Sequence, residues 1–247
     1  MSEYGWVPAT QKKEERVIML RKFFEVVQLT VLSNEKLIPG IACRRLSMSE
    51  KADFALIAWS QKAKLDARSV QTAPIDLKGL TSNIPAIRAM TTKDPQIFCG
   101  ELVKLLAGCG IAVVFLPHIG GSFLHGATFY DKNKIVIGLT VRGKDADKFW
   151  FSLFHEIAHI LLGHLNQDEG TSEADEAAAD AFAKNTLIPN EAFTRFVSNG
   201  QFSKDSILVF AKAVGIDPGI VVGRLQKEGF IEFNWHNDLK TRYQITA

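Results

Sequence analysis

Five consecutive residues, His155-Glu156-Ile157-Ala158-His159, carry the clearest chemistry in this 247-residue chain. They lie within a long apolar run, Phe149 to Leu162, which is typical of a buried helix. Residues four apart on a helix are separated by about 40° around its axis, so both imidazoles point to one side. Two neutral imidazoles at this spacing can bind one Zn²⁺, with Glu156 beside the metal as a general base. The pattern predicts a metal-dependent hydrolase, most simply a peptidase.

A catalytic zinc site needs a third protein ligand and an open position for water. The segment from Glu176 to Ala183 places Glu176 and Asp180 four residues apart, on one face of a second helix. Five alanines in this segment favour a close approach of the two helices. We therefore predict that Glu176 is the third ligand of one Zn²⁺ per chain. Asp180 is then the predicted acceptor for the free ring N–H of a metal-bound histidine.

Simpler interpretations of the same residues stay open at this point. A bare five-residue match is a weak signal, so the two histidines are also compatible with hydrogen-bonded positions in a core helix, although the helical context and the spacing of Glu176 and Asp180 favour the metal site. Glu176 is also compatible with a first-turn carboxylate that the helix dipole favours. Asp175, one position away, competes with it as a ligand, and Asp180 fits a solvated face as well.

The expected mechanism assigns a role to each predicted group. The metal lowers the pKa of its bound water and polarises the scissile carbonyl, while Glu156 takes the water proton and delivers it to the leaving amine. The tetrahedral oxyanion needs a donor, for which His164, His125 and Tyr130 are candidates that the sequence does not separate. His164 is more simply a surface or helix-end histidine. We also expect the strand over Lys134 to Thr140 to lie along the cleft and pair with an extended peptide substrate.

The elements that must position these residues form an α+β fold. Apolar spacing and end signals predict mostly helices, with a small mixed or antiparallel sheet of about three strands packed on the metal-binding helix, a zincin-like arrangement. The predicted helices cover about 14–32, 47–65, 94–108, 145–163, 172–188, 190–197 and two stretches within 204–229. The predicted strands cover 111–116, 126–130 and 134–140, the last two joined as a hairpin through Asp131-Lys132-Asn133. Three regions follow: an N-terminal helical region over 1–75, a zincin-like metallopeptidase domain over 76–200 and a C-terminal helical extension over 201–247.

Composition excludes several other classes of protein. Hydrophobic residues make up 47% and charged residues 23% of the chain, and the formal net charge is +2, so we expect no direct nucleic-acid binding. The three cysteines follow no C-x-x-C spacing and indicate reduced thiols rather than a disulfide framework. No signal peptide and no apolar stretch long enough to span a bilayer are evident, so we expect a cytoplasmic protein that is not bound to a membrane.

The residues around the predicted site resemble the ImmA/IrrE family of zinc metallopeptidases. The resemblance rests on the run Phe149 to His159, on Glu176-x-x-Ala179-Asp180-x-Phe182-Ala183 and on Leu187-Ile188-Pro189. It is specific across about 110–190. It implies the same assignment, with His155, His159 and Glu176 as ligands and Glu156 as catalytic base. Looser similarity at both ends is to members fused to a helix-turn-helix antitoxin or repressor domain.

Membership of such a family implies regulated cleavage rather than broad digestion. The expected substrate is a helix-turn-helix repressor or antitoxin, whose cleavage releases phage, mobile-element or stress genes. The alternative is a non-proteolytic interaction or sensor domain of a toxin–antitoxin or phage regulator, with a structural or vestigial metal site. Glu156 favours the enzyme, because a purely structural site needs no base beside its ligands.

Overall fold

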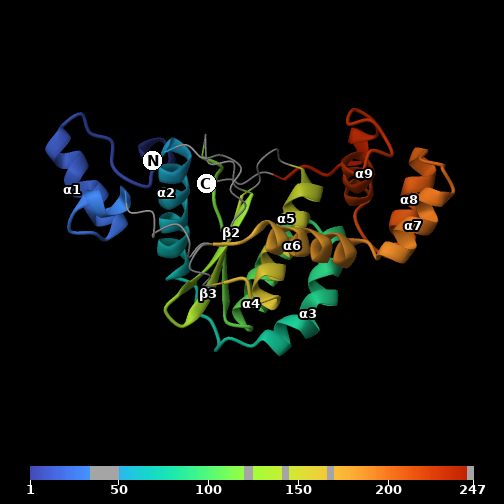
Figure 1. The fold of residues 1–247 in the computed structure, drawn as a ribbon, viewed down its shortest axis with the longest axis horizontal. Helices are drawn as coiled ribbons and strands as arrows, with labels where there is room; N and C mark the ends of the chain where they lie inside the picture. The colour runs from blue at the N-terminus through green and yellow to red at the C-terminus, as the bar shows by residue number, and fades with distance from the viewer. Residues whose placement is uncertain (34–49, 120–124, 141–144, 166–169, 244–247) are drawn as a thin grey trace.

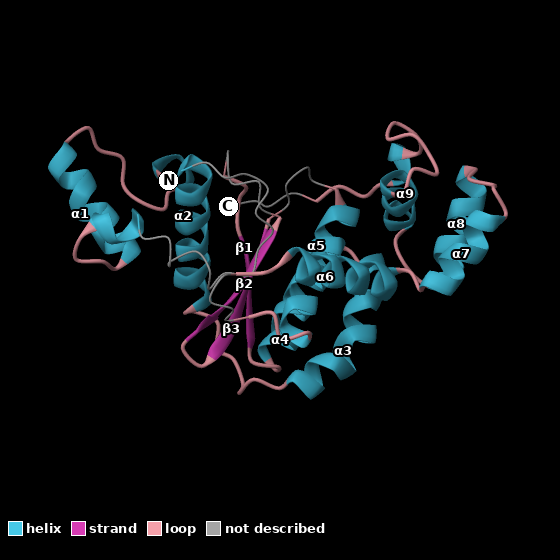
Figure 2. Ribbon diagram, in the orientation of Figure 1, coloured by secondary structure: helices cyan, strands magenta, loops and turns pink. Residues whose placement is uncertain are grey.

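A computed structural model describes residues 1–33, 50–119, 125–140, 145–165 and 170–243. The predicted α+β class is confirmed: helices surround a three-stranded sheet (Figure 2). Residues 47–49, the start of the helix predicted over 47–65, lie outside the described residues. The α-helices are α1 (Lys13–Phe24), α2 (Glu50–Ala67), α3 (Leu77–Ala89), α4 (Pro95–Ala107), α5 (Ala146–Leu161), α6 (Glu173–Leu187), α7 (Asn190–Ser198), α8 (Lys204–Val214) and α9 (Pro218–Lys227).

The sheet is mixed, and its spatial order is β1-β3-β2. Strand β3 (Lys134–Leu139) pairs in parallel with β1 (Ile111–Phe115) and in antiparallel fashion with β2 (Gly126–Asp131). The hairpin predicted between β2 and β3 is therefore confirmed. The prediction that the strand over Lys134–Thr140 pairs with substrate is wrong, because β3 is the central strand and both of its edges are already hydrogen-bonded. Strand β2 is the edge strand that contacts α5, the helix with the predicted metal ligands.

Helices cover both faces of this sheet, which explains the continuous apolar run of β1. Alternate strand residues such as Val113 and Ile137 pack among α3, α4, α5 and α6, whereas Ala112 and Val136 pack against α2. In Figure 1, α2 lies on one side of the sheet, and α4, α5 and α6 lie on the other. Helix α5 is therefore the inner helix of the molecule, and twelve of its residues are buried.

Helix α2 belongs structurally to the sheet, although it lies in the predicted N-terminal region. The Trp59 side chain is fully buried on the sheet, and its indole N–H donates to the carbonyl of Pro117 at 3.2 Å. Gly138 in β3 makes this contact feasible, since a Cβ there would lie 2.6 Å from the Trp59 ring. This close approach locks α2 onto β3.

One predicted helix end differs from the structure, and one helix of the structure was not predicted. Helix α1 ends at Phe24 rather than near residue 32, because Glu25 adopts a left-handed conformation with φ of 56°. Helix α3 is absent from the elements predicted above. It contains Pro85, which normally disfavours a helix interior, yet its buried Leu80 and Ile87 anchor it to the core.

The C-terminal extension is joined to the start of α5 by specific contacts. The Ala146 N–H donates to the carbonyl of Thr241 at 2.9 Å, and the indole N–H of Trp150 donates to the Tyr243 hydroxyl at 3.0 Å. Lys240 and Asp147 form an ion pair at 3.0 Å with both side chains about nine-tenths buried. The segment 240–243 thus fixes the helix that carries the predicted metal ligands.

Among the described residues, no single helix has the length and apolar character needed to cross a membrane. Only α8 and α9 taken together, across a bend of 113°, meet that criterion.

The packing of Trp59 on Gly138 predicts a strong response to one methyl group. The Gly138→Ala variant should lose about 1–3 kcal/mol of stability, because the added Cβ overpacks a fully buried ring. Gly100→Ala is the matched control, since Gly100 lies in α4 with open space around its Cβ position, and alanine favours a helix over glycine. Urea unfolding measures both variants. Equal stability of the two proteins would contradict the packing argument.

Candidate metal centre

The two histidines lie on one buried face of α5. His155 is 7% exposed and His159 is fully buried, so their imidazoles are removed from bulk water. The helix begins at Ala146, with Asp145 as its N-cap residue, and ends at Leu161 before Gly163, close to the boundaries predicted from the sequence. Its stripe of apolar residues faces the core and turns the two imidazoles toward α6. Any group that balances the charge of these buried imidazoles therefore has to come from α6.

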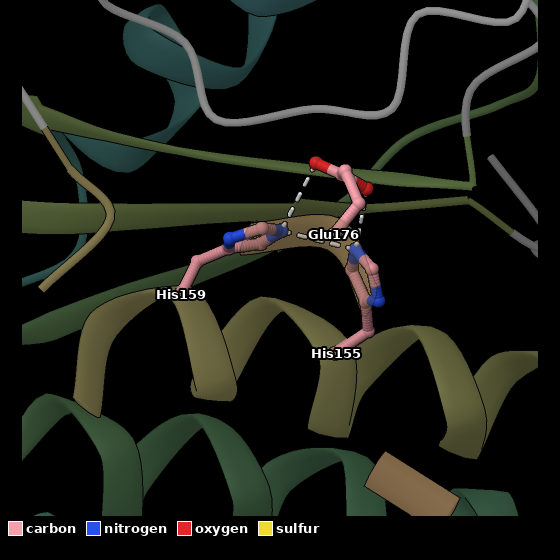
Figure 3. Close-up of side chains that lie close together, drawn as sticks. All are labelled: His155, His159 and Glu176. Carbon is pink, nitrogen blue, oxygen red and sulfur yellow. Dashed lines mark hydrogen bonds and ion pairs between the residues drawn. The ribbon is translucent and has the colours of Figure 1, made fainter. Parts of the chain in front are cut away.

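Helix α6 brings Glu176 to both imidazoles, as Figure 3 shows. The Nε2 atoms of His155 and His159 are 3.0 Å apart. Glu176 Oε2 lies 3.3 Å from the first, and the other carboxylate oxygen, Oε1, lies 3.5 Å from the second. A tetrahedral zinc ion with bonds of about 2.0–2.1 Å places its ligand atoms roughly 3.3 Å apart. The three observed separations bracket that spacing, so the residues present fit one such ion.

The second oxygen of Glu176 supports the same conclusion. Glu176 Oε1 accepts a hydrogen bond from the Thr171 hydroxyl at 2.7 Å, whereas the buried Oε2 accepts none among the described residues. A buried carboxylate oxygen without a donor is costly unless a cation or another donor approaches it. Its nearest partner is His155 Nε2, so the orphaned oxygen points at the space between the ligands.

Small residues allow α6 to approach this closely. Ala179 and Ala183 are fully buried against the core, four residues apart on the same side as Glu176 and Asp180. Ala177, Ala178 and Ala181 are exposed, so two of the five alanines make the approach rather than all five.

Asp180 orients the first histidine. Its Oδ1 lies 2.9 Å from His155 Nδ1, a contact in which Nδ1 donates its proton to the carboxylate and which would leave Nε2 for a metal. Asp180 thus occupies the position predicted for it from the sequence, behind the ligand rather than on a solvated face.

A second chain of contacts runs behind the other histidine. His159 Nδ1 lies 3.0 Å from His164 Nδ1, and His164 Nε2 lies 3.3 Å from Asp175 Oδ1. Asp175 also closes the capping box of α6 by accepting from Ser172. The structure therefore places Asp175 two contacts away from the ligand nitrogens, while Glu176 makes the direct approach.

Glu156 is buried between α5 and strand β2. It is 3% exposed, and the Thr128 hydroxyl donates to its Oε2 at 2.5 Å. Gly126 gives it room, because a Cβ there would lie 2.7 Å from Glu156 Oε1. Burial raises the pKa of Glu156 to about 7, against the lowering effects of His155 and of the Thr128 hydrogen bond. A carboxylate with this pKa can accept and return a proton near neutral pH.

The two imidazoles differ in charge. Burial lowers the pKa of His155, but hydrogen bonds with Asp180 and Glu176 outweigh it and raise that pKa to about 10. Burial and the neighbouring His155 charge lower the pKa of His159 to about 4. Burial raises the pKa of Glu176, but the close contact with the His155 imidazole and the hydrogen bond from Thr171 outweigh it, so that the pKa is lowered overall. At neutral pH the His155 imidazole is thus protonated and positively charged, whereas the His159 imidazole is neutral.

The three predicted oxyanion donors occupy different places. Of the three, only His125 lines the cleft that contains Glu156. Both ring nitrogens of His164 face His159 and Asp175, on the far side of the ligands. Tyr130 lies two residues beyond Thr128 on the same face of β2 and is 42% exposed. These positions favour His125 for a role beside the reacting carbonyl.

A cleft of about 670 Å³ opens from Glu156 and His155. Its walls come from α5, α6 and α9 and from the segment 233–242. The sequence alone does not predict the contribution of α9 and the C-terminal segment, nor the roles of Thr128 and Gly126. Strand alternation places Thr128 and Tyr130 on one face of β2. Only the fold shows that this face meets Glu156.

Comparison with known protein families gives one match. Residues 110–225 match the Peptidase_M78 family, described as an IrrE N-terminal-like domain. The match confirms the resemblance predicted from the sequence, and it ends within α9. A search of curated proteins finds no match.

The charge state of the ligands predicts proton-linked metal binding. Zn²⁺ must displace the proton of the His155–Glu176 contact, because a ligating imidazole nitrogen cannot carry one. His155 is protonated below a pKa of about 10, so the affinity for Zn²⁺ should rise at least tenfold per pH unit between pH 6 and 9. Calorimetry in buffers of different ionisation enthalpy should count at least one proton released per metal ion.

The Glu156→Gln variant controls for titration of the neighbouring base and should still release one proton. Zinc binding without proton release in both proteins would contradict the assigned charge state. Binding of more or less than one ion per chain would contradict the ligand set.

Proposed function

We propose, on the premise that residues 110–225 are an IrrE N-terminal-like domain of a peptidase family, that this chain is a zinc-dependent endopeptidase. Its proposed substrate is a helix-turn-helix repressor or antitoxin, whose cleavage regulates gene expression. The observation that carries the proposal is the cluster of His155, His159 and Glu176, whose ligand atoms lie 3.0–3.5 Å apart with one carboxylate oxygen against each imidazole and Glu156 buried beside them.

The proposed mechanism divides the work among residues of α5, α6 and β2. His155, His159 and Glu176 would hold Zn²⁺, which supplies Lewis-acid activation of a water molecule and of the scissile carbonyl. Glu156 accepts the water proton and passes it to the leaving amine, as its pKa near 7 permits. Thr128 holds Glu156 Oε2 and so keeps the carboxylate turned toward one side.

The edge strand β2 is the proposed binding surface for the substrate backbone. One edge of β2 pairs with β3, and no strand among the described residues pairs with the other. An extended peptide added there would lie beside Thr128 and Glu156, since main-chain hydrogen bonding along an exposed edge is a common mode of peptide recognition. In this proposal β2, rather than β3, is the strand that pairs with an extended peptide substrate.

The alternative function is a non-proteolytic interaction or sensor domain with a structural metal site. Glu156 argues against this alternative. Burial of an ionisable carboxylate destabilises the fold, and a structural metal site does not need such a group beside its ligands. A cleft that opens on this carboxylate is likewise expected of an enzyme.

Removing the base should separate metal binding from proteolysis. The Glu156→Gln variant should bind one Zn²⁺ with unchanged ligands but cleave the repressor encoded at the same locus about 10²–10⁴ times more slowly, because no group accepts the water proton. Mass spectrometry of the repressor after incubation measures the cut, and metal analysis checks the loading. Undiminished cleavage by the variant would remove Glu156 from the mechanism.

The hydrogen bond from Thr128 predicts a pH shift. This bond lowers the pKa of Glu156, so the isosteric Thr128→Val variant should raise that pKa. Because the base must be ionised, half-maximal cleavage on the acidic side should move to higher pH, with the largest loss below pH 7. Thr140→Val is the matched control, since the buried Thr140 hydroxyl has no hydrogen-bond partner among the described residues. Identical pH profiles for both variants would contradict a role for Thr128.

A further inference from the structure

Two helices line the cleft beside the metal centre with stripes at helical spacing. On both α5 and α6, the residues that line the cleft recur every three or four positions. Each helix therefore presents one face to the cleft. The residues are Lys148, Phe151, Ser152 and His155 on α5, and Asp180, Lys184 and Leu187 on α6, with Ile188 directly after it. Both helices therefore border this cleft, called the channel below, over several turns, and α9 and residues 233–242 complete its walls.

The channel leads from the metal ligands to α9. Asp180 contacts His155 at the ligand end, and α6 then continues by one turn to Lys184. At the other end Arg224 of α9 donates to the carbonyl of Ile188 at 2.7 Å and to that of Lys184 at 3.3 Å. Helix α9 is thus fixed across the end of α6, and the cleft has a defined far end.

The acidic side chains along this channel are neutralised. Each of the four carboxylates outside the catalytic Glu156 has a basic partner within 3.0 Å. The pairs are Asp145 with Lys148 at 2.8 Å, Asp147 with Lys240 at 3.0 Å, Asp180 with His155 at 2.9 Å, and Glu228 with Arg224 at 3.0 Å.

Basic side chains are left in excess. Lys184 and Lys227 both line the cleft and have no acidic partner within 4.0 Å in the described part of the chain. Lys184 is only partly exposed, so its charge is less screened by solvent than that of a surface lysine. Arg242 shares Asp145 with Lys148, at 3.9 Å. The far end of the channel therefore carries a net positive charge.

The position of Lys184 sets a distance from the chemistry. Glu176, Asp180 and Lys184 follow one another at intervals of four residues on one face of α6. Eight residues of helix correspond to roughly 12 Å along the axis. An extended peptide covers about 3.3 Å per residue, so roughly 12 Å spans three to four residues.

We propose that this channel binds the substrate on one side of the scissile bond and that Lys184 selects an acidic side chain three or four residues from that bond. The inference rests on the proposed peptidase function. Apolar groups line the path and its far end. The Phe151 ring lies 6.3 Å from the His155 ring, Leu187 is buried in the wall just beyond Lys184, and Phe233 is 72% exposed. The ligand is thus a peptide with apolar side chains near the cut and Asp or Glu beyond them.

The test measures binding apart from cleavage. A library of end-capped, randomised ten-residue peptides is incubated with zinc-loaded Glu156→Gln protein, and the retained peptides are identified by mass spectrometry. The same selection is run on Glu156→Gln proteins that also carry Lys184→Gln, Lys184→Glu or Lys212→Glu. Lys212 is the matched control, because it lies in the last turn of α8 as Lys184 lies in that of α6, but is exposed and outside the cleft.

The expected result is at least fivefold enrichment of Asp and Glu at one peptide position. The enrichment should disappear with Lys184→Gln, invert toward Lys and Arg with Lys184→Glu and persist with Lys212→Glu. Retention of no peptides, absence of acidic enrichment, or the same enrichment in all four proteins would overturn the proposal. Lys184→Gln keeps the test decisive if Lys184→Glu fails to fold.

The selected peptides also distinguish this inference from the proposed function. Protein with Glu156 intact should cut them three or four residues from the selected acid. If acidic peptides are selected but not cleaved, the result would contradict the peptidase function and support the proposed binding of acidic peptides in the channel. If peptides are cleaved without selection of acidic residues, the result would support the peptidase function and contradict the proposed role of Lys184.

Discussion

The central constraint in this molecule is charge burial between two helices. Helix α5 carries His155, Glu156 and His159 in the interior, where an unpaired charge is expensive. Helix α6 places Glu176 and Asp180 on the facing side, and the distances of 2.9–3.5 Å put a carboxylate beside both imidazoles. The proposed metal chemistry depends on this helix contact, because a shift of one turn in either helix would separate all of these groups.

The rest of the fold keeps α5 and α6 in register. The sheet supports α5 from one side, and Thr128 reaches from β2 to hold Glu156. The segment 240–243 fixes the start of α5 through Trp150 and Asp147, and α9 fixes the end of α6 through Arg224. The C-terminal elements therefore work as part of the site, in line with a family match that continues to residue 225.

Helical spacing predicts the two halves of the candidate ligand cluster from the sequence, one on each helix. The i, i+4 relation places His155 near His159 and Glu176 near Asp180 whatever the tertiary fold, so local geometry carries that prediction. Helix α3 escapes prediction because Pro85 and a composition poor in helix formers hide it, and tertiary burial of Leu80 and Ile87 outweighs propensity. The central position of β3 escapes it as well, because hydrogen-bond pairing between strands is a long-range property. Thr128, Gly126 and Lys184 acquire their roles only through such contacts.

The central claim is that His155 Nε2, His159 Nε2 and a Glu176 oxygen bind one metal ion. Anomalous diffraction at the zinc absorption edge, on crystals of the zinc-loaded protein, tests it most directly. We expect one strong peak about 2.0–2.2 Å from all three atoms, with Asp180 and His164 outside bonding distance. A peak coordinated by Asp175 and His164, or one on the surface with the three ligand atoms unbound, would contradict it.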